Sequence, residues 1–446
     1  MQVKNAEQMI EKAKFNNKFH GKLLFWGAFL MLFDGYDLTV FGAVVPTLME
    51  EWNISPIETG MMASYALFGM MFGAFIFGTI ADKLGRKKVI IICTFIFSLF
   101  MLLAGLTNNP DLFALFRFIT GLGLGGVFPN VIALISDYSP KGTRSRMVAT
   151  IMAGYAIGGI LAALLGLVMI PTFGWQSVFI FGSLPLLFLP FLAKSLPDTV
   201  GSHISRKEYS KIKEILGKMD PFYTPSENEQ FVMNNEKKSS SPVTALFAEK
   251  RTLSTIMFWV TFFMSLIMIY GLNTWLPKLM NEAGFPLGSS LSFLLALNVG
   301  AALGSVIMGW LADLWGVKRA IIMFYLIASI TITSLGFATN MILLYVLVAV
   351  AGATTMGTQN LTNSYISQYY PTSIRSTGLG WASGIGRIGG IVGPTIGGFL
   401  LASSLELKIN FMVFALPGVI AAFAVFFTDR QAKQTFVSEN QPKSAL

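Results

Sequence analysis

Charged side chains are scarce in this sequence: Asp, Glu, Lys and Arg together make up only 12% of its 446 residues. Hydrophobic residues account for 54%, whereas soluble domains carry about 25% charged residues. A chain of this composition could not bury its apolar surface in a water-soluble globule. The composition therefore excludes a soluble protein and predicts a chain that crosses a membrane several times.

Cysteine and histidine are almost missing. The single cysteine, Cys93, excludes a disulfide within the chain. The two histidines, His20 and His203, flank the apolar segments, so we expect no metal site at the membrane midplane and no cofactor. The chain also lacks a Gly-x-x-x-x-Gly-Lys-(Ser/Thr) loop for ATP, which argues against a primary pump or another membrane enzyme.

Twelve apolar runs are long enough to cross a bilayer as helices. They lie near residues 23–48, 60–81, 89–107, 112–135, 147–170, 175–195, 253–277, 288–312, 320–338, 341–368, 377–402 and 409–428. The predicted fold is an all-α membrane protein with two six-helix bundles. We expect the first bundle and its N-terminal tail in residues 1–195, a linker in 196–251 and the second bundle in 252–446.

Lys and Arg are distributed unevenly between the two sides of the predicted membrane. One side, with the N-terminal tail, the linker and the C-terminal tail, carries 28 of them, and the opposite side carries two. By the positive-inside rule, both tails and the linker are cytoplasmic in a cell (inner) membrane. The formal charge of +9 therefore reports topology, and no nucleic-acid partner is needed to explain it. Residues 206–219 are basic with spaced apolar positions, which is typical of a helix lying on a membrane surface.

The two halves of the chain are related by an internal repeat. The segment Gly78-Thr-Ile-Ala-Asp-Lys-Leu-Gly-Arg-Lys-Lys88 after the second apolar run matches 309–319 after the eighth run at an offset of 231 residues. Pro140 and Arg144 match Pro371 and Arg375 at the same offset. Two motifs that agree on one offset indicate a duplicated six-helix unit, an architecture found in secondary transporters.

Three motifs resemble those of known transporters. The segment 78–88 resembles the signature loop of the major facilitator superfamily, and 117–123 resembles its fourth-helix motif. Asp34-Gly35-Tyr36-Asp37 is similar to the Asp-Gly-x-Asp signature of the aromatic acid:proton symporters. The resemblance implies a secondary transporter that imports a small aromatic carboxylate, of the benzoate or hydroxybenzoate type, with protons and by alternating access. We expect it to function as a monomer.

Other substrates remain open at this point. An importer of nicotinate or of another small organic acid would use the same scaffold, and the residues alone separate it poorly. A drug-efflux antiporter is less favoured, because the fifth apolar run reads Gly-Tyr-Ala-Ile-Gly-Gly at 154–159, without the proline typical of that branch. A membrane receptor that does not transport is a further alternative.

Four formally charged residues lie well inside the apolar runs: Asp34, Asp37, Arg117 and Arg387. Intramembrane charges are costly and usually functional. None of the four has a charged counterpart in the other half at the 231-residue offset, which favours an asymmetric ligand over a shared framework role. We expect Arg387, and also Arg117, to bind a substrate carboxylate, and Asp34 or Asp37 to carry the proton. A structural ion pair remains the alternative.

Aromatic and loop residues complete the predicted sites. Phe41, Tyr155 and Trp381 are candidates for contact with a substrate ring, although most aromatic residues in such a chain face lipid or other helices. Gating at the cytoplasmic helix ends is predicted for five residues of the repeated loops: Asp82, Arg86, Arg144, Asp313 and Arg375. The alternative for the basic residues of these loops is that they only fix topology.

Overall fold

The computed structural model describes residues 2–140, 142–219, 223, 229–232, 243–249, 251–371, 374–403 and 405–428. Within this part of the chain, twelve candidate spans are long and apolar enough to cross a membrane, so the predicted all-α, multi-pass fold is confirmed. The spanning helices are α2 (Asn17–Trp52), α3 (Pro56–Leu84), α4 (Arg86–Leu106), α5 (Pro110–Asp137), α6 (Arg144–Phe173), α7 (Gln176–Gly182) with α8 (Pro185–Ser195), α11 (Thr252–Glu282), α12 (Leu287–Trp315), α13 (Val317–Leu335), α14 (Met341–Tyr369), α15 (Arg375–Ala402) and α16 (Leu407–Phe426).

The chain divides into two compact units. The first comprises Met1–Ile54, Met61–Lys237 and Pro286–Leu295, and the second comprises Ser55–Gly60, Lys238–Phe285 and Ala296–Leu446. The first unit thus takes in most of the segment expected to be a linker. The sixth span consists of two helices, because Pro185 occupies the first turn of α8 and its ring nitrogen cannot donate to the preceding helix.

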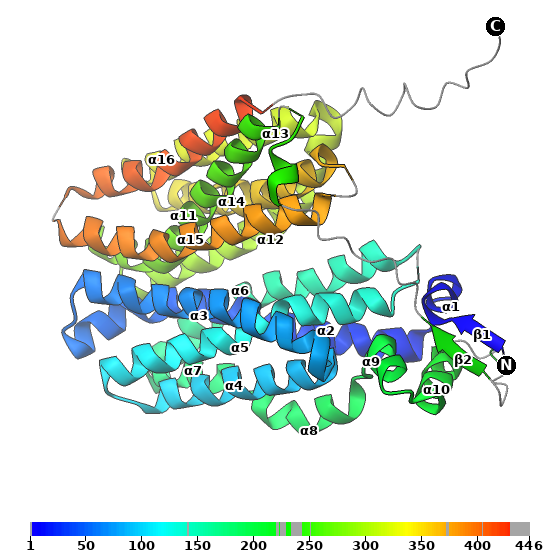
Figure 1. Ribbon diagram of the computed structural model, residues 1–446. Coiled ribbons are helices and arrows are strands. Elements are labelled where there is room, and N and C mark those ends of the chain that lie inside the picture. Colours follow the sequence, from blue (N-terminus) through cyan, green and yellow to red (C-terminus); the bar gives the residue numbers. More distant parts are fainter. Residues whose placement is uncertain are drawn as a thin grey trace, which may run out of the picture. The chain divides into compact units, whose positions relative to one another are not determined.

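Part of the middle connection folds together with the N-terminal tail. Strand β1 (Gln2–Asn5) pairs in parallel with β2 (Glu229–Val232), beside α1 (Ala6–Lys12), α9 (Val200–Ser205) and α10 (Tyr209–Met219). Figure 1 shows these elements gathered at one end of the first unit. Ile212 and Leu216 of α10 are buried in the same hydrophobic cluster as Ile10 of α1. The helix expected near 206–219 therefore exists, but its apolar face packs against protein.

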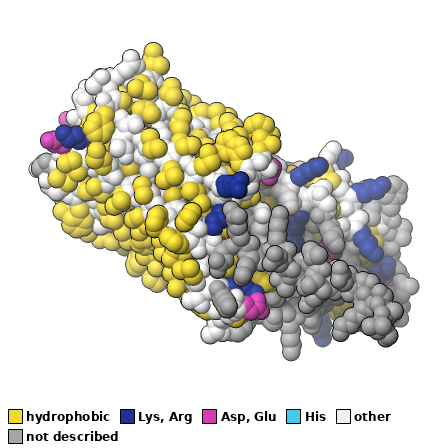
Figure 2. All heavy atoms as spheres, turned by 90° about the horizontal axis from the view of Figure 1, so that it is seen from above, with side chains coloured by type: hydrophobic (Ala, Val, Ile, Leu, Met, Phe, Trp, Pro, Cys, Tyr) yellow, Lys and Arg dark blue, Asp and Glu magenta, His cyan; other side chains and the backbone are white. Residues whose placement is uncertain are grey.

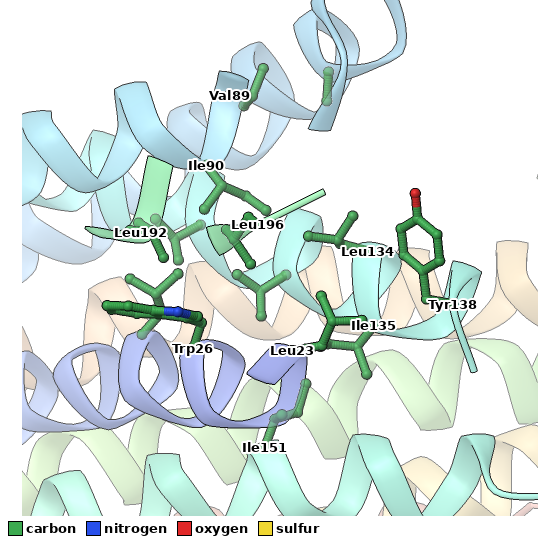
Figure 3. Packing of buried hydrophobic residues seen from close by; sticks show 14 of the residues in the cluster. Leu23, Trp26, Val89, Ile90, Leu134, Ile135, Tyr138, Ile151, Leu192 and Leu196 are labelled. Carbon is green, nitrogen blue, oxygen red and sulfur yellow. The ribbon is translucent and has the colours of Figure 1, made fainter. Parts of the chain in front are cut away.

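A hydrophobic core fills the end of the first unit where α2 begins (Figure 3). Leu23 and Trp26 of α2 are buried with Ile135 of α5, Ile151 of α6 and Leu192 of α8. Side chains from helices far apart in sequence therefore share one core. Burying each such side chain stabilises the fold by about 1.5–3 kcal/mol. Here the buried side chains hold α2, α5, α6 and α8 together at this end of the unit.

Glycines bring α2 and α6 into backbone contact. A Cβ atom at Gly158 would overlap the carbonyl of Leu32, and one at Gly35 would overlap the carbonyl of Tyr155. In the second unit, Gly389 of α15 approaches the carbonyl of Phe263 of α11 in the same way. These contacts are the small-residue packing that is common between membrane helices, and they explain much of the glycine content near Arg387.

The close contacts also reproduce the internal repeat. Gly158 against Leu32 becomes Gly389 against Phe263 when both residue numbers rise by 231. The same shift converts the contact of Gly69 with the Phe118 carbonyl into that of Gly300 with the Ala349 carbonyl, and the contact of Gly121 with Ala66 into that of Gly352 with Leu297. Each unit therefore contains the same helix-pair geometry, as a duplicated six-helix unit requires.

The outer surface is predominantly apolar. Figure 2 shows one face on which hydrophobic side chains form a broad continuous area, with Lys and Arg lying toward its ends. Large side chains such as Val306, Ile342 and Phe399 are exposed. Exposed apolar patches on soluble monomers rarely exceed a few hundred Å², so this surface is suited to contact with lipid chains.

The α2–α6 contact makes a testable prediction about stability. Gly35→Ala should lower the free energy of unfolding by about 1–3 kcal/mol, the usual cost of overpacking, because the new methyl group meets the Tyr155 backbone. Gly78→Ala is the matched control, since nothing lies within 4 Å of its Cβ position. Thermal unfolding of the purified proteins in detergent is the measurement. Equal midpoints for the two variants would contradict the packing described.

Candidate functional site

A buried ion pair joins α2 and α5 in the first unit. Arg117 donates a hydrogen bond from Nη1 to Oδ1 of Asp37, and both side chains are 3% exposed. The rings of Phe41 and Phe179 lie 5.6 and 5.8 Å from the guanidinium carbon, within the range of cation–π attraction. Two charges in an apolar bundle are tolerated because each neutralises the other, and removal of one would leave the other uncompensated.

The four residues 34–37 face several neighbouring helices. Gly35 allows the close approach of α6, Tyr36 donates its hydroxyl to the Val178 carbonyl of α7 at 2.8 Å, and Asp37 binds Arg117 of α5. Asp34, one turn before Asp37, is also buried, with 1% of its surface exposed. This sequence therefore fixes the rotation of α2 among its neighbours and brings both carboxylates inside the first unit.

Arg117 has hydrogen-bonding capacity that Asp37 does not use. Its Nε atom is buried and has no hydrogen-bond partner among the described residues. A guanidinium group presents donors in a planar fork that matches two carboxylate oxygens. The arrangement can therefore accept a second anionic or polar group without an additional cation.

Arg387 of α15 differs from Arg117 in its surroundings. Its side chain is partly exposed, and within the described part of the chain it has neither a hydrogen bond nor an ion pair. Its neighbours Gly386 and Gly390 pack against Phe262 and Tyr270 of α11. The second unit thus holds a fixed helix with an available intramembrane cation, which is chemically suited to an anionic ligand.

The predicted aromatic residues fall into different settings. Phe41 is buried beside Arg117. Trp381 is 45% exposed and stacks on Trp259 with a centroid separation of 5.8 Å. Tyr155 is half-buried, contacts Phe128 edge-on at 6.4 Å and supplies the carbonyl approached by Gly35. In the first unit, Phe41 therefore lies beside Arg117. In the second unit, Trp381 lies on the same helix as Arg387.

The predicted gating residues are only partly brought together. Arg86 forms an ion pair with Asp137 at the end of α5, a partner that the sequence did not indicate. The side chain of Asp82 lies outside the described residues. Arg144, Asp313 and Arg375 are exposed, and no hydrogen bond or ion pair joins any of these three side chains to another described residue.

Asp198 and Arg206, which the sequence analysis did not single out, hold the loop at Leu84 and Gly85. Arg206 donates to the Leu84 carbonyl at 2.9 Å and lies 3.4 Å from Asp198 Oδ2. Gly85 has φ +92°, and a Cβ there would lie 2.7 Å from Asp198 Oδ1. Tyr138 donates its hydroxyl to the Asp198 carbonyl. The segment around α9 therefore clamps the α3–α4 connection to α5, although no motif in the polar segment signalled this contact.

The described residues contain no group of three or more His, Cys, Asp or Glu side chains that could hold a metal ion. The formally charged groups that lie well inside the apolar runs are two carboxylates, Asp34 and Asp37, and two guanidinium groups, Arg117 and Arg387. These carboxylate and guanidinium groups can bind protons and carboxylate anions reversibly, without forming a covalent bond to the ligand.

Comparison with known proteins gives a consistent picture. The profile of the Major Facilitator Superfamily matches residues 27–300 and 287–445. A "Benzoate transport protein" of Acinetobacter baylyi is 43% identical over 438 residues, covering 96% of this chain and 94% of that protein. The "4-hydroxybenzoate transporter PcaK" of the same organism is 34% identical over 411 residues, covering 89% of each chain. The crystal structure of a D-xylose–proton symporter has the same fold, with a TM-score of 0.74, 16% identity and coverage of 93% of this chain and 99% of that one.

The ion pair makes a prediction that does not depend on function. Arg117→Gln should destabilise the protein by about 3–5 kcal/mol, because it leaves a buried carboxylate without its counter-ion. Adding Asp37→Asn should restore much of that loss, since the amide pair carries no charge. Thermal unfolding of wild type, both single variants and the double variant measures the coupling. Additive losses in the double variant would show that the two side chains do not act as a pair.

Proposed function

The chain belongs to the major facilitator superfamily, and on this premise we propose that it imports a small aromatic carboxylate together with protons. The substrate is of the benzoate or hydroxybenzoate type, as the names of the two relatives suggest. The observation that carries the proposal is the buried ion pair of Asp37 with Arg117 in one unit, one turn from the buried acid Asp34, while Arg387 lacks a described partner in the other. The protein works as a monomer by alternating access.

The orientation follows from the distribution of charge. The side rich in Lys and Arg faces the cytoplasm of a cell (inner) membrane, so both termini and the middle connection are cytoplasmic. We assign the two six-helix bundles to residues 1–195 and 252–446, with the connection at 196–251 between them in sequence. Uptake then proceeds from the side that carries few basic residues.

Arg387 receives the substrate carboxylate in this proposal. A guanidinium fork binds a carboxylate with two parallel hydrogen bonds, and Arg387 has no competing acid among the described residues. Trp381, six residues earlier on α15 and 45% exposed, is our candidate for contact with the aromatic part in the second unit. Phe41 and Tyr155 are the candidates of the first unit. Arg117 assists when its ion pair opens.

Asp34 and Asp37 bind the coupling proton. Protonation of Asp37 would end its ion pair with Arg117 and release a buried guanidinium that then favours an incoming anion. Proton binding and carboxylate binding thereby become mutually favourable, which is the thermodynamic requirement for symport. Asp34, one turn before Asp37 and also buried, is the alternative carrier of the proton.

The gate consists of the charged helix ends. The Arg86–Asp137 ion pair links the start of α4 to the end of α5, and we assign Asp82 and Arg144 to the same closure. Asp313 and Arg375 occupy the repeat-related positions of the second unit. Charge-assisted bonds of this kind have two discrete states, made or broken, which suits a gate.

Replacement of Arg387 tests the substrate assignment. Arg387→Gln should weaken benzoate binding about 30-fold, because hydrogen bonds to charged groups contribute about 1.5–3 kcal/mol. Equilibrium binding of radiolabelled benzoate to the purified protein is the measurement. Arg146→Gln, which removes an exposed arginine at the start of α6, is the matched control. Unchanged affinity in Arg387→Gln would remove this residue from the site.

A substrate panel tests the chemical class. Proteoliposomes with an inwardly directed proton gradient should accumulate benzoate and 4-hydroxybenzoate more strongly than nicotinate, and should not accumulate acetate, which offers no ring. Equal uptake of acetate would contradict an aromatic site. Nicotinate as the preferred substrate would favour the alternative importer, and export of cationic drugs would favour an efflux antiporter.

Replacement of Arg86 tests the gate. Arg86→Gln should leave benzoate affinity unchanged but slow uptake by about tenfold, equivalent to about 1.4 kcal/mol on the rate-limiting barrier. Lys88→Gln, two residues away and exposed, should transport normally. Parallel binding and uptake assays separate the two effects. A loss of affinity in Arg86→Gln would place this arginine in the binding site instead.

A further inference from the structure

Three helices of the first unit each contribute two residues, spaced four apart, to the buried ion pair and its surroundings. These residues are Asp37 and Phe41 of α2, Phe113 and Arg117 of α5, and Trp175 and Phe179 at the start of α7. Residues i and i+4 share a helix face, so each helix turns both of its side chains the same way. The ion pair therefore lies beside a group of aromatic rings.

The rings of this group pack against one another. Phe113 lies edge-on to Phe179, with centroids 5.2 Å apart, and contacts Phe41 at 6.2 Å. Trp175 lies edge-on to Phe113 and to Phe179, at 5.7 and 5.9 Å. A Cβ atom at Gly105 of α4 would lie 2.9 Å from the Cβ of Phe179. Phe179 is thus enclosed on several sides and held in one position.

A hydrogen bond fixes the same group at its other end. The indole Nε1 of Trp175 donates to Glu51 at the end of α2, at 2.8 Å. Trp52 lies edge-on to Trp175 and to Phe113, with centroids 5.1 and 5.3 Å apart. Contacts with α2, α4 and α5 therefore hold the rings in place, and the rings do not depend on the ion pair for their position.

The guanidinium of Arg117 lies over two of these rings, Phe41 and Phe179. The face of an aromatic ring carries partial negative charge and attracts a cation, more strongly where water is excluded. The ring repels an anion, so an ionised Asp37 beside the guanidinium offsets part of this attraction. The attraction is therefore greatest when Asp37 is neutral. Arg387 has no such ring contact within the described part of the chain.

We propose that Phe179, together with Phe41, holds the guanidinium of Arg117 while Asp37 is protonated and the ion pair is open. The inference rests on the proposed proton symport with Asp37 as the acid, and it deepens that proposal by naming the residues that make opening possible. Both phenylalanines are positioning residues for Arg117. No bond forms or breaks in this step apart from the binding of the proton to a carboxylate oxygen of Asp37.

The rings act through the difference between the closed and the open ion pair. Without them, protonation of Asp37 would leave a bare cation inside the first unit, which is costly. Because they stabilise the open state more than the closed one, they lower the barrier to opening. They also keep the guanidinium in place. Its Nε atom, which has no hydrogen-bond partner among the described residues, then stays available to a carboxylate.

A fluorine series at Phe179 tests the electrostatic role of the ring. Fluorine withdraws electron density from the ring face and changes its size little, so mono-, di- and trifluorophenylalanine weaken cation–π attraction in steps. Proton-driven uptake of radiolabelled benzoate by the full-length protein in proteoliposomes should fall at each step. The trifluoro form should lose about tenfold, equivalent to about 1.4 kcal/mol on the barrier. Phe179→Leu, which has no ring face, should lose at least as much.

Thermal unfolding in detergent tests the same attraction without transport. Asp37→Asn replaces the acid by a neutral group and so resembles the protonated form. Trifluorophenylalanine at position 179 should lower the unfolding midpoint about 2 °C further in the Asp37→Asn protein than in the wild type, because the guanidinium then depends on the rings alone. If Asp37→Asn does not fold, the uptake series decides by itself.

Phe97 of α4 is the matched control for packing. Its ring is equally buried, and within the described part of the chain no Lys or Arg lies over it. The same fluorine series at Phe97 should leave uptake unchanged. It should also change the unfolding midpoint equally in the wild type and in Asp37→Asn, since the two substitutions do not share a partner.

The outcomes distinguish this inference from the proposed function. Wild-type uptake that does not respond to a pH gradient would overturn proton symport and the inference that rests on it. Proton-coupled uptake that is equally fast throughout the series at Phe179 would overturn the inference alone. Losses at Phe97 as large as those at Phe179, or equal midpoint changes in the two backgrounds for Phe179, would also overturn it, because either result indicates packing instead of attraction to the guanidinium.

Discussion

The buried ion pair between Asp37 and Arg117 is the constraint on which the first unit depends. Neither charge is tolerable alone in an apolar bundle, so α2 and α5 must meet at this level and in this rotation. Once α2 is fixed in that rotation, Gly35 faces α6 and Tyr36 faces the Val178 carbonyl. The four residues 34–37 therefore act as one structural feature that also carries the acids proposed for function.

The two units share their framework and differ in their chemistry. Gly158 and Gly389 make equivalent backbone contacts at the repeat offset, so the small-residue packing belongs to the duplicated fold. The charged residues do not follow the repeat: Arg117 is paired and shielded by aromatic rings, whereas Arg387 has no partner among the described residues. Packing has been retained in both units, while each unit has acquired its own charged groups.

Much of this architecture could be predicted from sequence because membrane spans need long apolar runs, and buried charges stand out within them. The partner of Arg117 could not be predicted, because the position of a residue along a span gives its depth in the membrane but not the neighbouring helix that its side chain faces. The contact of Phe179 with Arg117 could not be predicted either, because nothing distinguishes this residue from the other Phe residues among the 39 in the sequence. Asp198 and Arg206 were missed because they lie in a polar segment, where charges are ordinary until a fold brings them to Gly85.

Counting the formal charges well inside the apolar runs gives a physical reason for the proposed coupling of proton and carboxylate. Asp34, Asp37 and Arg117 leave the first unit with one negative charge, and Arg387 leaves the second with one positive charge. Binding of a proton alone or of a carboxylate alone would give the transporter a net intramembrane charge, which is costly in a low-dielectric medium. Binding of both neutralises each unit, and binding of neither leaves the total at zero. The fully loaded and the fully empty protein are therefore the forms that can rearrange most easily, and a carrier that moves only in these two forms is a symporter.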